Sequence, residues 1–368
     1  DTKARWTDVR RLPRPPGGLP ILAPMLKTVL RAAPLAALLL ASFALVAPAA
    51  QADSTVERSF GDRASDATRD YWTPARIGAA QPLELGRAGA VDANALNAGK
   101  PRAIPSAGGV ELSNTIAPSR PTESYRRAPK IKPGERPPYT SGEVPLATQT
   151  TFPTSTNGLL VGKLRGFGDY SCSATVVSSE SDSVVMTAGH CIYDFQAGFA
   201  RRVAFAPAYN RGDTPFGVWS AAELVATRQW RRGNYNYDYA TVRLHESGGQ
   251  AVGAVVGEQG VAFEQPREQT FQAIGYPFNR GQAERMWNCV GEFAGVDPRG
   301  NRTSGEADNA MGCDMKQGAS GGGWFIQDGA GSQFLNSVTS FGYKNFKKVI
   351  FGPYLTKKVR QVVNTADR

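Results

Sequence analysis

Histidine and cysteine are scarce in this chain, which has two histidines and four cysteines among 368 residues. No Cys-x-x-Cys pair occurs, and only one of the histidines, His190, lies near a cysteine in the sequence. Structural zinc requires four closely spaced nitrogen or sulfur ligands, so this pattern argues against a zinc site. The Asp-rich spacing typical of calcium loops is missing as well. We therefore expect neither a bound metal nor a cofactor.

The sequence also lacks a basic stripe for nucleic acid, although its formal net charge is +10. Residues 1–150 contain 20 Lys/Arg against 13 Asp/Glu, and residues 151–368 contain 22 against 19, so most of the excess lies in the first part. No Lys/Arg cluster has aromatic residues interleaved with it. Phosphate binding depends on such clustered charge, and we expect no nucleic-acid partner.

A hydrophobic run long enough to cross a membrane is missing too. The apolar stretch at residues 35–47 is shorter than the roughly 20 residues that a bilayer requires. Lys27 and Arg31 precede it, and a small-x-small cleavage site ending at Ala52 follows it. Residues 25–52 are therefore predicted to be a secretory signal peptide that is cleaved near Ala52. We expect a secreted protein with no membrane association after cleavage.

The segments on either side of this signal peptide have little regular pattern. Residues 1–24 carry no motif and are interpreted as an extension from an upstream start. Residues 53–150 are rich in Ala, Arg, Pro and Gly, and the prolines of residues 126–145 prevent regular structure. We predict a largely irregular pro-segment and linker there, in which only residues 70–85 form a short ordered piece.

From about residue 150 the chain changes to short β-branched and aromatic runs separated by turn residues, a pattern that predicts an antiparallel all-β protein. One amphipathic helix is expected at residues 354–366, where Leu355, Val359, Val362 and Val363 share a face. The clearest strand candidates are residues 158–164, 171–179, 181–189, 201–207, 237–244, 269–277, 321–328 and 335–343.

The four cysteines, Cys172, Cys191, Cys289 and Cys313, all follow residue 150. An even number in an exported chain indicates disulfides. Four cysteines allow three pairings. Pairing each cysteine with its nearest neighbour closes the shortest loops, but loop length alone does not decide between the three.

A candidate nucleophile lies in the stretch "CDMKQGASGGGWF", where small residues on both sides leave the Ser320 hydroxyl accessible. Gly318 can adopt backbone angles that aim its N–H and that of Ser320 at one point, as an oxyanion hole requires. A serine hydroxyl needs a base to become nucleophilic. His190 follows a strand in the turn "TAGHC" and is the favoured base, whereas His245 is interpreted as a solvated surface residue.

The base in turn needs a carboxylate to orient its ring. Asp238 directly precedes the alternating strand "YATVRL" and would be held rigidly there. Asp194 and Asp213 remain alternatives, although neither is followed by a buried strand.

These motifs together, "TAGHC", "DYATVRL" and "GASGG" in the order His, Asp, Ser, resemble the chymotrypsin-like serine proteases. The resemblance covers residues from about 150 to 368 and is closest to the secreted bacterial branch related to glutamyl endopeptidases, through "IGYP", "CDM" and "SFG". It implies two antiparallel six-stranded β-barrels, residues 151–255 and 256–368, the second carrying the C-terminal helix.

The resemblance implies a role for each site residue. His190 is the general base, Asp238 its orienting carboxylate and Ser320 the nucleophile of a serine endopeptidase that cleaves polypeptides through an acyl-enzyme. The N–H groups of Gly318 and Ser320 form the oxyanion hole. A Cys172–Cys191 disulfide ties the strand before the histidine to its turn. The substrate backbone pairs with the strand of Thr339, Ser340, Phe341 and Gly342.

One departure from the family concerns activation, and two further observations concern specificity. Ala319 replaces the aspartate that binds a new N-terminus in the trypsin branch, so the pro-segment does not act through a salt bridge there. Asp314 lies at the offset of the trypsin pocket aspartate and favours cleavage after Arg or Lys, while no histidine follows residue 245 to support cleavage after Glu. Glutamyl specificity and a mere turn-capping role for Asp314 stay open.

Two other classes of function use similar motifs. An α/β-hydrolase requires its histidine after the nucleophile, and both histidines precede Ser320. An inactive binding module on a protease scaffold stays open, although all three triad candidates are present. We expect a monomer whose pro-segment binds the mature protein.

Overall fold

The computed structural model describes residues 55–83, 85–86, 115–119, 139–300, 303–344, 346 and 348–368. All of these described residues belong to one compact unit. The predicted upstream extension and signal peptide lie outside the described residues. Within those residues, no helix combines the length and the apolar character needed to cross a membrane.

Six strands close into a barrel in the order β12, β11, β6, β7, β8, β13 and back to β12, every neighbouring pair being antiparallel. Its core is apolar, and Leu160, Phe205 and Val242 are fully buried. The strands are β6 (Asn157–Leu164), β7 (Gly168–Val176), β8 (Val184–Thr187), β11 (Arg201–Pro207), β12 (Trp219–Thr227) and β13 (Ala240–Leu244).

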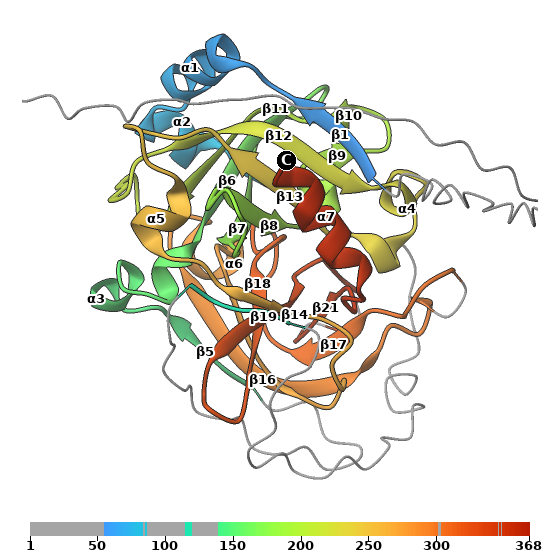
Figure 1. Cartoon of the computed structure of the whole chain (residues 1–368). Helices are drawn as coiled ribbons and strands as arrows, with labels where there is room; N and C mark the ends of the chain where they lie inside the picture. Colours follow the sequence, from blue (N-terminus) through green and yellow to red (C-terminus); the bar gives the residue numbers. More distant parts are fainter. Residues whose placement is uncertain are drawn as a thin grey trace, which may run out of the picture. The chain divides into compact units, whose positions relative to one another are not determined.

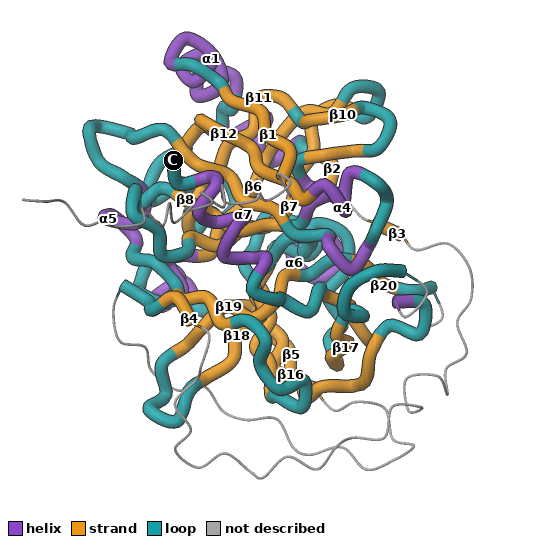
Figure 2. The backbone as a smooth tube through the Cα atoms, turned by 45° about the vertical axis from the view of Figure 1, so that its right-hand side comes forward, coloured by secondary structure: helices purple, strands orange, loops and turns teal. Residues whose placement is uncertain are grey.

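A second sheet of eleven strands lies beside this barrel, with the order β3-β20-β21-β17-β16-β15-β18-β19-β14-β4 and with β5 added to β16 (Figure 2). Trp324 and Phe271 pack in its core with their ring centroids 5.6 Å apart. Its strands are β3 (Leu85–Gly86), β4 (Thr115–Ile116), β5 (Tyr139–Glu143), β14 (Gly260–Ala262), β15 (Thr270–Gly275), β16 (Trp287–Val296), β17 (Asn309–Gly312), β18 (Gly323–Gln327), β19 (Gln333–Val338), β20 (Phe341–Gly342) and β21 (Val349–Gly352).

Helices are few, and the C-terminal one packs on the first barrel. Helix α7 (Lys358–Ala366) buries Val359, Val362 and Val363, and the Thr241 hydroxyl donates to the Val362 carbonyl at 3.1 Å (Figure 1). The predicted all-β class with a C-terminal helix is thus confirmed. The other short elements are α3 (Leu146–Gln149), α4 (Arg228–Arg231), α5 (Val252–Val256), α6 (Phe278–Gly281), η2 (Thr154–Thr156), η3 (Gly189–Cys191), η4 (Tyr235–Tyr237) and the hairpin of β9 (Tyr193–Asp194) with β10 (Gly198–Phe199).

The N-terminal segment is more ordered than the sequence indicated. Strand β1 (Thr55–Ser59) pairs along β12, and α1 (Asp62–Tyr71), α2 (Pro74–Ala79) and β2 (Gln81–Pro82) follow it (Figure 1). The prediction that order within residues 53–150 is confined to residues 70–85 is therefore wrong for β1, most of α1, β4, β5 and α3. Strand β5 forms inside the proline-rich stretch 126–145 because it pairs with β16. Helix α1 is too polar to show an apolar face in the sequence, and its order comes from contacts with the barrel.

Two disulfides realise the local pairing of the four cysteines. Cys172 of β7 is bonded to Cys191 of η3, and Cys289 of β16 is bonded to Cys313, which follows β17. The first bond joins a barrel strand to the turn that contains His190. A disulfide lowers the entropy of the unfolded chain, so each bond adds to the stability of the turn it closes.

Prediction: a buried acid makes stability depend on pH. Glu258, just before β14, is 5% exposed, and burial together with the negative charge of Asp182 raises its pKa from 4.5 to about 8. The unfolded chain loses this proton at a lower pH than the folded chain, so the free energy of unfolding falls as pH rises from 4.5 to about 8. Glu258→Gln should raise the melting temperature at pH 8 and leave it nearly unchanged at pH 4. An equal gain at both pH values, measured by calorimetry, would contradict this.

Candidate active site

Asp238 and His190 meet because the strands that carry them are paired. Asp238 ends the turn before β13, His190 lies in η3 just after β8, and β13 pairs with β8 so that Ala240 faces Thr187. The Asp238 carboxylate is fully buried and accepts hydrogen bonds from the backbone N–H of His190 at 2.8 Å and from its Nδ1 at 2.8 Å. The Ser340 hydroxyl donates to the same carboxylate from the second sheet.

These bonds fix the state of the imidazole. Because the carboxylate accepts from Nδ1–H, the neutral ring presents Nε2 as its proton acceptor. Nε2 is buried, and no residue in the described part of the chain forms a hydrogen bond with it. His190 itself is 5% exposed. The ring can therefore take a proton from a hydroxyl brought to its Nε2 side.

The two alternative carboxylates lie elsewhere. Asp194 accepts the backbone N–H groups of Gln196 and Ala197, which makes it the cap of its own turn. Asp213 belongs to a short bridge with Asn210. The second histidine, His245, donates from Nε2 to the Phe60 carbonyl at 3.0 Å and is partly covered by the N-terminal segment, so the expectation of a solvated side chain is only partly correct.

The loop before β18 places Ser320 next to the strand end that carries His190. Gly318 has a φ of +88°, and a Cβ there would lie 2.4 Å from the Tyr276 carbonyl. Gly321 has a φ of +80°, and a Cβ there would lie 2.1 Å from Thr187 Oγ1. Both positions therefore require glycine. The contact with Thr187, three residues before His190, brings the serine loop to the histidine turn.

Ser173 of β7 is a positioning residue that the sequence analysis missed. Its N–H donates to the Ser320 carbonyl at 2.7 Å, and its hydroxyl donates to the Gly318 carbonyl at 2.9 Å while accepting the Tyr276 N–H at 2.9 Å. It is 1% exposed. In the sequence, its position next to Cys172 in a predicted strand is the feature that could have indicated this role, and that signal is weak. Its bonds join the first barrel to the serine loop.

A backbone carbonyl already lies at the predicted oxyanion hole. The Gly318 N–H donates to the Leu83 carbonyl oxygen at 3.0 Å, and the Ser320 hydroxyl donates to the same oxygen at 3.4 Å. The Leu83 N–H donates to the Ser171 carbonyl at 2.9 Å. The loop therefore binds a peptide carbonyl at the point where a serine could attack it, and the occupant comes from the N-terminal segment.

Asp314 is engaged by its own neighbours. Its side chain is 8% exposed, forms an ion pair with Arg280 at the end of α6, and has Oδ1 3.8 Å from Cys289 Sγ. Burial, and after it the charge of Asp314, raises the pKa of Tyr139 on β5. Thr339 Oγ1 accepts the indole N–H of Trp324 at 2.9 Å. Of the predicted substrate-binding residues, Phe341 and Gly342 pair with β3 and Ser340 contacts Asp238.

The clusters of potential metal ligands do not fit a metal. Among the described residues, one cluster is Cys172, Cys191 and His190, and the other is Cys289, Cys313 and Asp314. In each of them both sulfur atoms belong to a disulfide. A metal requires the thiolate, so each cluster leaves a single usable donor.

Comparison with known proteins agrees with this geometry. A family model described as Trypsin matches residues 149–361. The glutamyl endopeptidase of Bacillus licheniformis is 37% identical over 84 residues, which are 23% of this chain and 26% of that protein. A protein of Bacillus subtilis named extracellular metalloprotease is 30% identical over 110 residues, 29% of this chain and 34% of that protein. The chain thus spans about a third or less of the length of these curated relatives.

Two solved structures resemble the chain over more than half of its length. The protease Anisep from Arthrobacter nicotinovorans has a TM-score of 0.55 and 31% identity, covering 62% of this chain and 99% of that chain. The thermostable serine protease AL20 from an extremophilic microorganism has a TM-score of 0.53 and 36% identity, covering 61% and 99%. The chymotrypsin-like fold predicted from the sequence motifs is confirmed.

Prediction: Ser173 stabilises the serine loop. Ser173→Ala removes the partner of the Gly318 carbonyl and of the Tyr276 N–H, and should lower the free energy of unfolding by about 1–3 kcal/mol. Ser171→Ala on the same strand is the matched control, because the Ser171 hydroxyl is buried and bonds to no described residue. Its effect should stay within about 0.5 kcal/mol. An equal decrease in the free energy of unfolding for the two variants, measured by urea unfolding, would show that the Ser173 hydroxyl does not stabilise the serine loop.

Proposed function

Because the chain belongs to the trypsin family, whose model matches more than half of its length, we propose that it is a secreted serine endopeptidase. Ser320 is the nucleophile, His190 is the general base, and Asp238 is the carboxylate that orients the imidazole ring and stabilises its protonated form. The observation that supports this most strongly is the buried Asp238–His190 pair with Nε2 left to accept a proton.

The reaction follows from these roles. Ser320 Oγ attacks the substrate carbonyl while its proton passes to His190 Nε2, and Asp238 stabilises the imidazolium that forms. The N–H groups of Gly318 and Ser320 bind the oxyanion. His190 then gives the proton to the leaving amine, which departs and leaves an acyl-enzyme. Water, deprotonated by the same ring, attacks the ester and releases the acid with Ser320 restored.

The Leu83 carbonyl supports the assignment of the oxyanion hole. Its oxygen lies 3.0 Å from the Gly318 nitrogen, within the range expected for a donor aimed at a reacting carbonyl oxygen. Ser173 and Tyr276 hold the Gly318 peptide from behind. A donor that is fixed before substrate arrives needs no rearrangement during the reaction, which is the basis of this kind of electrostatic catalysis.

Export and partners belong to the same proposal. The two disulfides favour an oxidising compartment. The relative named glutamyl endopeptidase and the protease structures support polypeptide substrates. The protein is proposed to act as a monomer outside the cell, after loss of the signal peptide near Ala52.

The Asp314–Arg280 pair bears on which substrate residue precedes the cleaved bond. The expected preference for Arg or Lys depended on a free Asp314 carboxylate, and this carboxylate is paired with Arg280. The pair leaves less negative charge for a basic substrate side chain. It favours the alternative, cleavage after Glu, which the similarity to a protein named glutamyl endopeptidase also supports.

Prediction: the triad variants lose activity and their matched controls keep it. Ser320→Ala, His190→Ala and Asp238→Asn should each lower kcat of peptide hydrolysis by at least about 10³-fold, because nucleophile, base and orienting carboxylate act as a unit. His245→Ala and Asp194→Asn are the controls for His190→Ala and Asp238→Asn. A fluorophosphonate should label Ser320 and nothing else. A parent chain that binds peptides without hydrolysing them, and takes up no label after its N-terminal segment is removed, would support the inactive binding module instead.

Prediction: the Asp314–Arg280 pair controls specificity. Arg280→Ala frees the Asp314 carboxylate and should increase kcat/KM for arginyl substrates relative to glutamyl substrates by roughly tenfold. Asp314→Asn, made in the Arg280→Ala background, should cancel the gain. An unchanged ratio in both variants, measured with a matched peptide panel, would place Asp314 outside the specificity pocket.

A further inference from the structure

A short stretch of the N-terminal segment crosses the catalytic site from one sheet to the other. We call residues 81–83 and 85–86 the strap. Gln81 and Pro82 pair with Tyr170 and Ser171 of β7, and Leu85 and Gly86 pair with Phe341 and Gly342 of β20. Between these pairings the Leu83 carbonyl accepts from Gly318 N–H. The strap thus fills the positions that the proposed function assigns to a substrate backbone.

Both pairings of the strap are parallel. The chain therefore passes β7 first, presents Leu83 to Ser320, and continues along β20. This direction can be compared with the direction that hydrolysis requires.

Hydrolysis fixes the direction of a substrate in this site. The part of the substrate that follows the attacked carbonyl leaves as an amine, and its nitrogen must take a proton from His190. His190 follows β8, which pairs with β7, and its turn is bonded to β7 through Cys172–Cys191. The leaving part has to lie on the β7 side, and the acyl part on the β20 side. In the strap, the residues that follow Leu83 lie on the β20 side, so its direction is the reverse.

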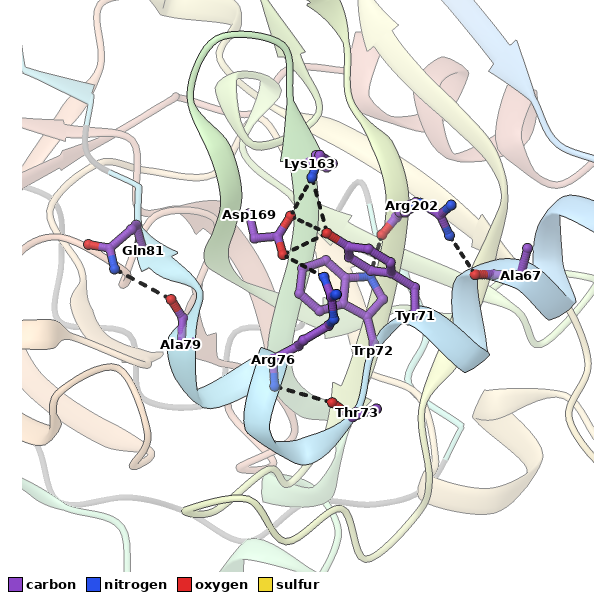
Figure 3. A network of polar contacts seen from close by, with 10 residues as sticks. All are labelled: Ala67, Tyr71, Trp72, Thr73, Arg76, Ala79, Gln81, Lys163, Asp169 and Arg202. Carbon is purple, nitrogen blue, oxygen red and sulfur yellow. Dashed lines mark hydrogen bonds and ion pairs between the residues drawn. The ribbon is translucent and has the colours of Figure 1, made fainter.

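The strap is held by contacts of Tyr71, Trp72 and Arg76 with the first barrel, and we call these three residues the anchor (Figure 3). The Tyr71 hydroxyl donates to Asp169 on β7 at 2.7 Å, and the Arg76 guanidinium lies 4.2 Å from the centre of the Tyr71 ring. Trp72 is 3% exposed, and its indole N–H donates to the Arg202 carbonyl at 2.5 Å. These contacts fix the segment immediately before the strap.

The anchor combines burial with charge. Asp169 is 3.3 Å from Lys163 Nζ and 3.6 Å from Arg76 Nη1. The Arg202 guanidinium lies 4.4 Å from the centre of the Tyr71 ring. Burying a tryptophan removes a large apolar surface from water. The anchor therefore supplies apolar burial and charged contacts, and the strap adds its backbone hydrogen bonds and the packing of Leu83.

We propose that the strap is an autoinhibitor of the proposed protease, which binds the cleft in the reverse direction and so blocks Ser320 without being cut. This rests on the proposed function. The leaving nitrogen of a reversed peptide lies away from His190, and any attack on Leu83 would return to the intact peptide. Cleavage of the chain between residues 87 and 138 would leave the strap bound through its anchor, and loss of the anchor contacts would activate the enzyme.

The test measures the rate at which a fluorophosphonate labels Ser320 in the full chain. Trp72→Ala removes the main apolar contact of the anchor, and Leu83→Pro removes the N–H that donates to Ser171 together with the packing of the Leu83 side chain against the core. Each should speed labelling, by at least about tenfold for Trp72→Ala and by roughly fivefold for Leu83→Pro. Arg63→Ala, an exposed position on α1, is the matched control and should label like the parent. Leu83→Pro leaves the anchor intact and covers the case in which Trp72→Ala fails to fold.

The direction of the strap has its own measurement. Mass spectrometry of the full parent chain during long incubation should show the bond between Leu83 and Glu84 intact. Over the same time the Trp72→Ala chain should hydrolyse an added peptide. Cutting of that bond by the protein itself, abolished by Ser320→Ala, would show that the strap binds as a substrate and would overturn the proposal.

The two proposals fail in different ways. If parent, Trp72→Ala and Leu83→Pro chains label at the same appreciable rate, the strap does not inhibit and the serine protease assignment stands. If no chain is labelled, even after the N-terminal segment has been cut and separated by size-exclusion chromatography, Ser320 is not an activated nucleophile, and both proposals are wrong.

Discussion

The buried carboxylate of Asp238 is the constraint on which the rest of the site depends. A charge with no exposure to water is tolerated only where donors surround it. Here the donors are the backbone and ring of His190, from the first barrel, and the hydroxyl of Ser340, from the second sheet. Satisfying this one group therefore fixes the imidazole and brings the end of β19 to it. The same requirement explains why the paired ends of β8 and β13 must keep their register.

The serine loop is fixed by a second set of contacts that also cross between the sheets. Ser173 binds the carbonyls of Gly318 and Ser320, and Gly321 packs against Thr187. The strap extends this arrangement, because its backbone pairs with β7 on one side and β20 on the other. Backbone groups of β7 and β20 can pair with a peptide in either direction, and only one direction lets His190 protonate the leaving group. The reversed strap uses these same backbone groups and adds the anchor, which holds it in place.

Much of the fold and the site could be predicted from local sequence patterns. The eight strand candidates showed alternation or dense β-branched runs, and "TAGHC" and "GASGG" identified His190 and Ser320. Strand β12 was missed because "WSAAELVAT" is rich in helix-forming residues, and its strand conformation comes from pairing with β11, β13 and β1. The Arg280 partner of Asp314 is 34 residues away in sequence. Leu83 acts through its backbone groups, which leave no mark in the sequence, and the partners of the Ser173 hydroxyl, Gly318 and Tyr276, lie more than 100 residues away along the chain.

The most direct test is a crystal structure of the chain after reaction with a fluorophosphonate. The account predicts a phosphorus atom bonded to Ser320 Oγ, its oxygen within hydrogen-bond range of the Gly318 nitrogen where the Leu83 carbonyl lies in the unreacted chain, and His190 Nδ1 still on Asp238. An adduct on another residue, or a phosphoryl oxygen that points away from Gly318, would contradict the assignment of nucleophile and oxyanion hole.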